Sequence, residues 1–147
     1  DAVDQEVMLK AIVSTPKIKE GEDLAVLFDP PVVIYYDLDK ADIRTDAALE
    51  LDKLVQILID NPTIKIELGS HTDVRGSPIY NFRLSQRRAE SAVEYIISRG
   101  IIRERLTAQG YGEDELIVEG ARTEEEHQVN RRTEFKVTGI GTAKVAE

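Results

Sequence analysis

Alternation between helical and extended patterns is the feature that most restricts the fold of this chain. Ile64, Ile66 and Leu68 alternate with two charged residues, a pattern that predicts a strand with one buried face. Helical patterns lie on both sides of this strand, and a second strand pattern follows at residues 106–111. Successive helix–strand units indicate an α/β fold, in which helices pack against a sheet.

The two long helices are bounded by residues that start or stop helices. The first is expected to take Thr45 as its N-cap and to end before Pro62, since the residue before a proline is pushed out of helical geometry. The second is expected to start with Ser77 as the cap and Pro78 at the first helical position, and to stop at Gly100. Apolar residues at helical spacing are Ala48, Leu51, Leu54, Val55 and Leu58 in the first helix, and Ala89, Ala92, Val93, Ile96 and Ile97 in the second.

Two further strands and a short helix complete the pattern. The β-branched and aromatic run at residues 32–36 predicts a buried strand ahead of the first helix. Thr123, followed by three glutamates, predicts a short capped helix that carries Asn130 and Arg131 near its end. Alternation at residues 133–137 predicts the last strand.

These elements define one domain with two flanks. The domain is expected to span residues 32–138. Residues 1–31 are expected to be an N-terminal extension or linker, and apolar runs at residues 7–13 and 24–28 favour a short hairpin there. Residues 139–147 are small and polar, and are expected to form a flexible tail.

Charge and composition exclude several classes of partner. The net charge is −9, which argues against binding to nucleic acid, because such binding neutralises many phosphates. No apolar run approaches the ~18 residues of a membrane span, so direct membrane insertion is not expected. Cysteine is absent, which excludes disulfides, thiol nucleophiles and cysteine-type zinc sites.

An acid and two polar helix residues are predicted to meet at the end of the strand that begins at Ile64. Asp73 lies in the loop after the strand, while Asn81 and Arg88 are seven residues apart on the helix and therefore differ by only about 20° in direction. Asp73 could receive an ammonium group and Arg88 a carboxylate, as a zwitterion would require. Spacing alone favours a plainer alternative, in which Asp73 caps the loop and Arg88 pairs with Glu94 or Asp37.

The chain also resembles a known protein family, and the resemblance favours the ligand-binding interpretation of these residues. Five motifs between residues 32 and 138 resemble, in order, those of the OmpA C-terminal family, which is shared with Pal and MotB. They are Tyr36-Asp37-Leu38-Asp39-Lys40-Ala41-Asp42-Ile43; Gly69-Ser70-His71-Thr72-Asp73 with Gly76; Asn81 with Leu84-Ser85 and Arg87-Arg88-Ala89; Gly110-Tyr111-Gly112-Glu113; and Asn130-Arg131-Arg132.

The resemblance implies a βαβαβ-type α/β (α+β sandwich) domain, with a mixed sheet and helices packed on one face, after a short N-terminal extension. It also implies non-covalent binding to peptidoglycan through the meso-diaminopimelate of the stem peptide. Asp73 then matches the residue that holds the diaminopimelate ammonium, and Arg88 the residue that holds its carboxylate. The resemblance further implies supporting contacts, with hydrogen bonds from Thr72, Asn81 and Arg131 and a position for Asp37 at the pocket rim.

Departures from the family pattern affect detail around this site. The glycine usual before the last helix is replaced within residues 124–127. Ser70 stands where glycine is common, and Thr133 where a larger β-branched residue is usual. Arg87 and Arg132 are expected to be structural or rim charges.

The resemblance places the domain in the periplasm of a Gram-negative cell, associated with the outer membrane, where it anchors a parent envelope complex to the cell wall. No catalysis, metal or cofactor is expected. Two rivals remain at this point: a cell-wall amidase or hydrolase that uses His71 and Asp73, and a protein–protein module that has lost the ligand. His71 and Asp73 alone are too few for a closed zinc site, and the acids at 37, 39 and 42 lack the glycine and terminal glutamate of a calcium loop.

Overall fold

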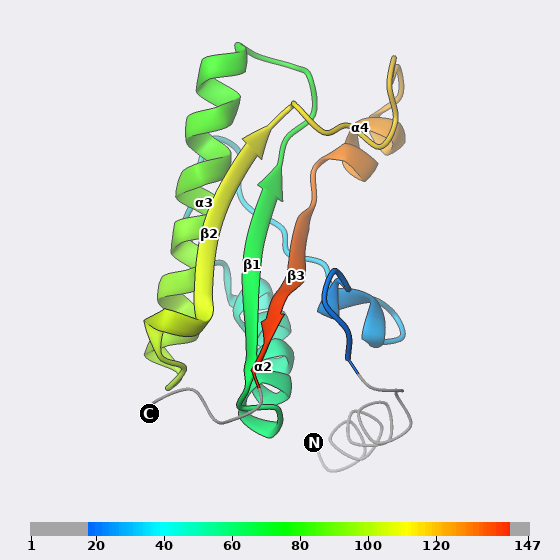
Figure 1. The fold of residues 1–147 in the computed structure, drawn as a ribbon. Helices are drawn as coiled ribbons and strands as arrows, with labels where there is room; N and C mark the ends of the chain where they lie inside the picture. Colours follow the sequence, from blue (N-terminus) through cyan, green and yellow to red (C-terminus); the bar gives the residue numbers. More distant parts are fainter. Residues whose placement is uncertain (1–17, 142–147) are drawn as a thin grey trace.

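The computed structural model describes residues 18–141, which form a three-stranded sheet with helices around it (Figure 1). Within these residues, no helix has both the length and the apolar character needed to cross a membrane. The elements, with η for a 3-10 helix, are η1 (Leu24–Leu27), α2 (Thr45–Asp60), β1 (Ile64–His71), α3 (Pro78–Ser98), η2 (Arg103–Arg105), β2 (Leu106–Gly112), α4 (Glu124–Asn130) and β3 (Thr133–Ile140).

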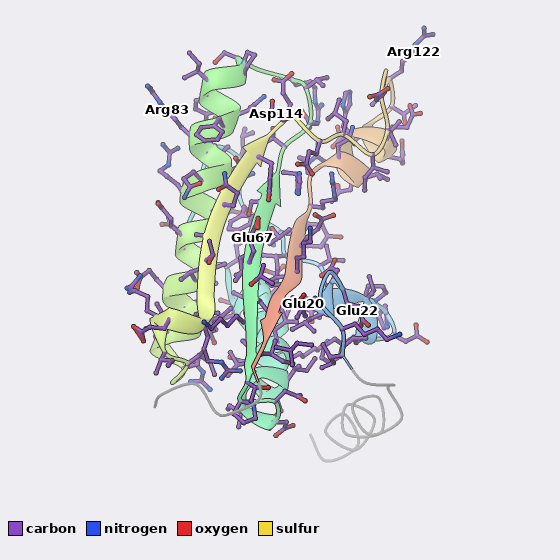
Figure 2. All side chains as sticks on the ribbon, in the orientation of Figure 1. Glu20, Glu22, Glu67, Arg83, Asp114 and Arg122 are labelled. Carbon is purple, nitrogen blue, oxygen red and sulfur yellow. The ribbon has the colours of Figure 1, made fainter. Side chains whose placement is uncertain are left out.

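The sheet is mixed and has the order β2-β1-β3. Central β1 runs parallel to β2 and antiparallel to β3, so that Leu68 lies opposite Ala108 on one side and Phe135 on the other. The long helices α2 and α3 cover the face that carries Leu68, and Glu67 lies on the opposite face (Figures 1 and 2). The predicted mixed sheet with helices on one face is therefore confirmed. The core that joins sheet and helices includes Leu51, Leu54, Leu58, Ile64, Ile66, Leu68, Ala92, Val93 and Ile96.

Helix α2 differs from the prediction at its start. Thr45 is its first residue and Arg44 is the N-cap, which makes no side-chain capping bond. Ala47 is buried and Ala48 only partly so, which shifts the inner face at the first turn by one residue. The C-terminal end is closed by Arg105, a buried guanidinium that donates to the carbonyls of Leu58 and Asn61, and also to Ile64. Arginine suits this place because the last carbonyls of a helix lack partners within it.

Helix α3 begins and ends as predicted. Ser77 is the N-cap, its hydroxyl accepts a hydrogen bond from the backbone N–H of Tyr80, and Pro78 occupies the first turn. Gly100 follows the helix with a φ of 106°, a conformation that glycine adopts without strain.

Contact between α3 and β2 is close enough to require glycine. A Cβ added at Gly110 would lie 2.4 Å from the backbone nitrogen of Gln86, well inside contact distance. The same approach lets α3 side chains bond the outer edge of β2. Gln86 accepts from the N–H of Gly110 at 2.7 Å, and Ser85 accepts from that of Gly112 at 2.9 Å. The helix thereby covers an edge that could otherwise pair with another strand.

The outer edge of β3 is covered by the segment that precedes η1. Gly21 donates to the carbonyl of Val137, Val137 donates to Glu22, and the carboxylate of Asp23 accepts from the N–H of Phe135. The prediction of a strand at residues 24–28 is wrong, because Leu24–Leu27 form a 3-10 helix capped by Asp23. The other half of the predicted hairpin, residues 7–13, lies outside the described residues.

Residues 32–36 are extended but do not form the predicted strand. Val32 and Ile34 are buried, whereas Val33 and Tyr35 between them are exposed, so the run is only half buried and not fully buried as predicted. The segment also forms no ladder with the sheet in the described part of the chain. Its alternation therefore reflects packing on the core rather than strand pairing. At the other end of the domain, β3 continues through Ile140, so the predicted tail began too early.

Candidate functional site

A cavity of about 690 Å³ lies beyond the end of β1 that carries His71. Its walls come from the loop that joins β1 to α3, the first half of α3, the extended segment around residues 34–39, and α4 with the residue after it. Of the six residues predicted for the site, five line this cavity: Thr72, Asp73, Asn81, Arg88 and Arg131. Asp37 is not part of the lining; its carboxylate pairs with Arg44 at 3.3 Å.

Asp73 is buried and already holds two guanidinium groups. Its Oδ2 accepts from Arg75 at 2.8 Å and from Arg131 at 2.6 Å, while Oδ1 accepts from the backbone N–H of Arg75 at 2.9 Å. Burial raises the pKa of this carboxyl, but the bonds from Arg75 and Arg131 outweigh that effect and lower the pKa to about 2. Asp73 is thus a carboxylate at neutral pH, and any ligand cation meets one that is already paired.

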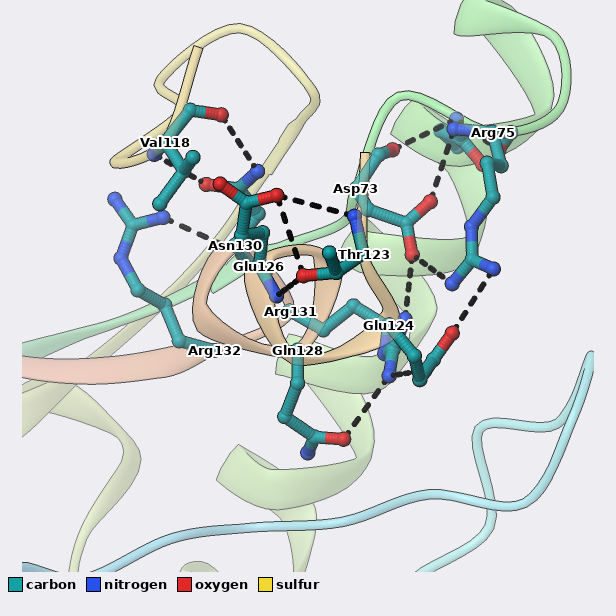
Figure 3. Close-up of polar contacts among 11 residues, drawn as sticks. Asp73, Arg75, Val118, Thr123, Glu124, Glu126, Gln128, Asn130, Arg131 and Arg132 are labelled. Atoms are coloured by element: carbon teal, nitrogen blue, oxygen red, sulfur yellow. Dashed lines mark hydrogen bonds and ion pairs between the residues drawn. The ribbon is translucent and has the colours of Figure 1, made fainter. Parts of the chain in front are cut away.

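Glu124 closes these contacts into a ring (Figure 3). Its Oε2 lies 3.1 Å from Arg75, and its Oε1 lies 2.5 Å from Arg131. Two carboxylates therefore alternate with two guanidinium groups, and the ring ties the loop after β1 to the N-terminus of α4. We call Asp73, Arg75, Glu124 and Arg131 the ion ring. Sequence analysis did not find Arg75 or Glu124.

Arg88 is held in a different way. Its Nε donates to the backbone carbonyl of Lys40 at 2.9 Å, its Nη2 donates to that of Asp37 at 3.1 Å, and the guanidinium carbon lies 4.8 Å from the ring centroid of Tyr36. Burial lowers the pKa of Arg88, although arginine stays charged at any physiological pH. Among residues 18–141, no carboxylate lies within ion-pair distance of it. Neutral carbonyls therefore orient this cation without neutralising it, and its Nη1 side stays available for a ligand.

The loop that orients Arg88 is fastened to α3 by two tyrosines. Tyr36 donates to the backbone carbonyl of Arg88 at 3.1 Å, and Tyr80 donates to the carboxylate of Asp39 at 2.5 Å. Asp39 has a φ of 58°, so the chain turns sharply at this point. Tyr80 was missed by sequence analysis, because its partner lies 41 residues away.

Asn81 supports the loop after β1 rather than facing the cavity with a free amide. Its nitrogen donates to the carbonyls of Asp73 and Arg75, at 3.3 and 3.0 Å, and to Glu113 at 3.3 Å. Gly76 allows this arrangement with a φ of 94° and a close approach to the Asn81 side chain. The contacts hold Asp73 and Arg75 in place, so Asn81 contributes to the site through them.

Thr72 and His71 have side-chain atoms that are closed off from solvent. Thr72 Oγ1 and His71 Nδ1 have no hydrogen-bond partner within the described part of the chain. His71 stacks on Tyr111, with ring centroids 4.9 Å apart, and its Nε2 lies 3.2 Å from Glu134. Burial lowers the pKa of His71. The imidazole thus faces Glu134 instead of Asp73, which is not the geometry that a His71–Asp73 hydrolase requires.

The lining of the cavity is rich in arginine, although the protein as a whole carries a net charge of −9. The lining includes Arg44, Arg75, Arg88, Arg131 and Arg132. Residues 18–141 contain no cluster of histidine and acidic side chains able to hold a metal ion. Arg75 and Arg131 pair with Asp73 and Glu124, while Arg44 pairs with Asp37 and Asp46, and Arg132 with Glu134, all three of which lie outside the lining. Among the described residues, Arg88 is therefore the one arginine of the lining that has no carboxylate partner, which favours a ligand that brings a carboxylate.

The start of α4 explains one departure from the family pattern. Thr123 caps the helix by accepting from the N–H of Glu126, and the Glu126 side chain accepts from the N–H of Thr123. This reciprocal capping box gives a glutamate a stabilising role in the segment where the family usually has a glycine. It also fixes the helix turn that carries Glu124.

Comparison with known proteins agrees with this fold and motif order. The model of the OmpA family matches residues 35–131. Outer membrane porin F of Pseudomonas fluorescens is 34% identical over 104 residues, which is 71% of this chain and 32% of that protein. The peptidoglycan-associated lipoprotein of Rhizobium meliloti is 37% identical over 84 residues, or 57% of this chain and 48% of that protein. The chain thus spans a third to a half of these relatives.

A solved structure supports the same fold. The peptidoglycan-associated lipoprotein from Burkholderia pseudomallei superposes with a TM-score of 0.67 at 24% identity, and the match covers 74% of this chain and 92% of that one.

Proposed function

This chain belongs to the OmpA family, and from that premise we propose that it binds peptidoglycan non-covalently through the meso-diaminopimelate of the stem peptide. The family includes relatives whose name is peptidoglycan-associated lipoprotein. By the same proposal, the domain works in the periplasm of a Gram-negative cell and anchors an outer-membrane or envelope complex to the cell wall.

One observation carries the choice of ligand: Arg88 is oriented but has no carboxylate partner among residues 18–141. A half-buried cation with free N–H groups is a ready receptor for a carboxylate, which a guanidinium binds through two parallel hydrogen bonds. Asp73 lines the same cavity and supplies an acceptor for an ammonium group. The free end of the diaminopimelate side chain carries both groups on one carbon.

The unpaired charge of Arg88 limits how tightly one stem peptide can be held. The other arginines of the lining already pair with carboxylates of the described residues, so they have less charge to offer a stem peptide. Each charge-assisted hydrogen bond contributes ~1.5–3 kcal/mol, so two or three give modest affinity for one stem peptide. Attachment of a complex to the wall then depends on many copies bound to one polymer.

No reaction is part of this proposal. Binding needs only that Arg88 and Asp73 retain their charge, and the residues between them act by position: Tyr36 and Tyr80 fix the loop that orients Arg88, and Asn81 fixes the loop that carries Asp73.

Co-sedimentation with purified diaminopimelate-type sacculi tests the proposal. Wild-type protein should sediment with the sacculi, and Arg88→Ala should largely remain in solution. Arg87→Ala is the matched control, because Arg87 is the exposed neighbour on the same helix and does not line the cavity. Equal sedimentation of wild type and Arg88→Ala would contradict the proposal, and release of soluble wall fragments would indicate an enzyme instead.

A further inference from the structure

The ion ring and the loop already occupy both oxygens of the Asp73 carboxylate. Oδ2 accepts two guanidinium groups and Oδ1 accepts a backbone N–H, and the residue is only 6% exposed. Both lone pairs of Oδ2 are in use, so a ligand ammonium can bond this oxygen only if one of its guanidinium donors moves away. The backbone donor is fixed by the loop, so the choice lies between Arg75 and Arg131.

Of the two side chains, Arg75 is the one able to leave. Its side chain is 52% exposed, and its ion-pair partners in the described residues are Asp73 and Glu124. The Arg131 side chain is 28% exposed and is held by Asp73, Glu124 and Gln128. Release of Arg75 therefore breaks fewer contacts and needs no movement of packed atoms.

Glu124 provides a place for Arg75 once it leaves Asp73. Arg75 Nη1 already lies 3.1 Å from Glu124 Oε2, so the guanidinium, once its Nη2 gives up Asp73, can turn both nitrogens to this carboxylate as a bidentate pair. The ring carries two positive and two negative charges and is neutral as a whole. A ligand ammonium would add one positive charge to it, which the ligand carboxylate bound by Arg88 would balance.

We propose that Arg75 is an internal substitute for the ligand ammonium on Asp73, and that Glu124 receives Arg75 when the ligand takes its place. This inference rests on the proposed function. It makes the site selective for stem peptides whose diaminopimelate amine is free, because an acylated amine, as in a cross-linked stem, has no charge with which to displace a guanidinium.

Competition within the site predicts opposite effects for two variants. Arg75→Gln removes the competitor, so affinity for a free-amine ligand should rise; a competitor present nine-tenths of the time lowers apparent affinity about tenfold. Glu124→Gln removes the alternative partner and leaves Arg75 on Asp73, so affinity should fall about threefold or more. Glu125→Gln is the control, since it removes the same charge from the same helix turn outside the ring.

Calorimetric titration with two probes tests the inference: the muramyl tripeptide N-acetylmuramyl-L-Ala-D-isoGlu-meso-diaminopimelate, and the same compound acetylated on its free amine. Arg75→Gln should bind the first probe more tightly than wild type does, with no gain for the second. The effect of Glu124→Gln should disappear in the double variant with Arg75→Gln, because the two residues act through one contact.

Three results would overturn the inference. Weaker binding of both probes by Arg75→Gln would make Arg75 a direct ligand contact, and unchanged binding would show that it does not compete. A Glu124→Gln effect that persists in the double variant would show that Glu124 acts through another residue. If wild type binds neither probe, the proposed function fails together with this inference, whereas the preceding results leave the proposed function standing.

Discussion

The guanidinium of Arg88 donates to the backbone carbonyl of Lys40 across 2.9 Å, which places a charged side chain against a neutral acceptor. Arg131, in the same cavity, lies 2.6 Å from the carboxylate of Asp73 and is neutralised by it. The difference separates two kinds of arginine within one site. Arg131 belongs to the framework of the ion ring, and Arg88 keeps a charge that a ligand can use.

Arg88→Lys should lower affinity for a diaminopimelate muropeptide at least about tenfold, even though the charge is kept. A lysine ammonium is a compact point charge and cannot bond two carbonyls while presenting a planar pair of donors to a carboxylate. Calorimetry should show this loss, with Arg87→Lys unchanged as the neighbouring control. Wild-type affinity in Arg88→Lys would mean that charge alone is sufficient at this position.

Asp73→Asn should lower the free energy of unfolding at neutral pH by about 2 kcal/mol, because the folded state lowers the pKa of this carboxyl from 3.8 to about 2. A lowered pKa stabilises the fold above the ordinary pKa, and this contribution is lost as the pH falls through the folded value. The difference between wild type and variant should therefore shrink from about pH 4 towards about pH 2.

Urea denaturation across this range is the measurement, with Asp114→Asn as the control at an exposed carboxylate. If the difference in the free energy of unfolding between wild type and Asp73→Asn stays constant with pH, the ion ring does not stabilise the ionised form of Asp73.

Gly110→Ala should destabilise the fold by about 2–4 kcal/mol. Its Cβ would lie 2.4 Å from the backbone nitrogen of Gln86 and 2.6 Å from Ser85 Oγ, so α3 would have to move away from β2. Gly139→Ala is the matched control in β3, where the added Cβ meets Lys65 at an ordinary 3.9 Å. Thermal unfolding of both variants would test the contact, and equal melting temperatures would argue against it.

Arg105→Met should cost about 2–4 kcal/mol, because methionine keeps the apolar packing but leaves buried carbonyls at the end of α2 without donors. Arg105 is 7% exposed and bonds two of these carbonyls, those of Leu58 and Asn61, together with the carbonyl of Ile64 in β1. Arg103→Met, which removes one exposed ion pair with Glu94, should cost less than about 1 kcal/mol. Denaturant unfolding measures the free energy of unfolding of both variants. Similar losses in the two variants would contradict the capping role of Arg105.

Much of the fold follows from local patterns in the sequence. Ser77, Pro78 and Gly100 bound α3 because caps and left-handed turns depend on residues next to each other in the chain. The prediction failed at residues 32–36 for a physical reason. A run of β-branched and aromatic residues favours an extended, partly buried segment, and Val32 and Ile34 are buried, but such a run does not determine whether the backbone finds a partner strand.

The candidate site, like the fold, was only partly predicted from the sequence. The family motifs predicted that Asp73, Arg88 and Arg131 share one site, and all three line the same cavity. Each lies at a fixed distance from the end of a strand or the start of a helix. Arg75 and Glu124 were not predicted. Their pairing joins two segments 49 residues apart through exposed side chains, and it depends on how α4 sits over the loop after β1. The position of α4 over this loop is visible in the folded structure and is not indicated by a local sequence pattern.

The central claim is that Arg88 and Asp73 together hold the zwitterionic end of diaminopimelate. Calorimetric titration of the wild-type protein with two muramyl tripeptides tests it most directly, one with meso-diaminopimelate and one with lysine at the third position. The lysine peptide keeps the ammonium but lacks the side-chain carboxylate that Arg88 would bind. We expect binding of the first to be at least about tenfold tighter, the value of one lost charge-assisted contact. Equal affinity for both peptides would contradict the account.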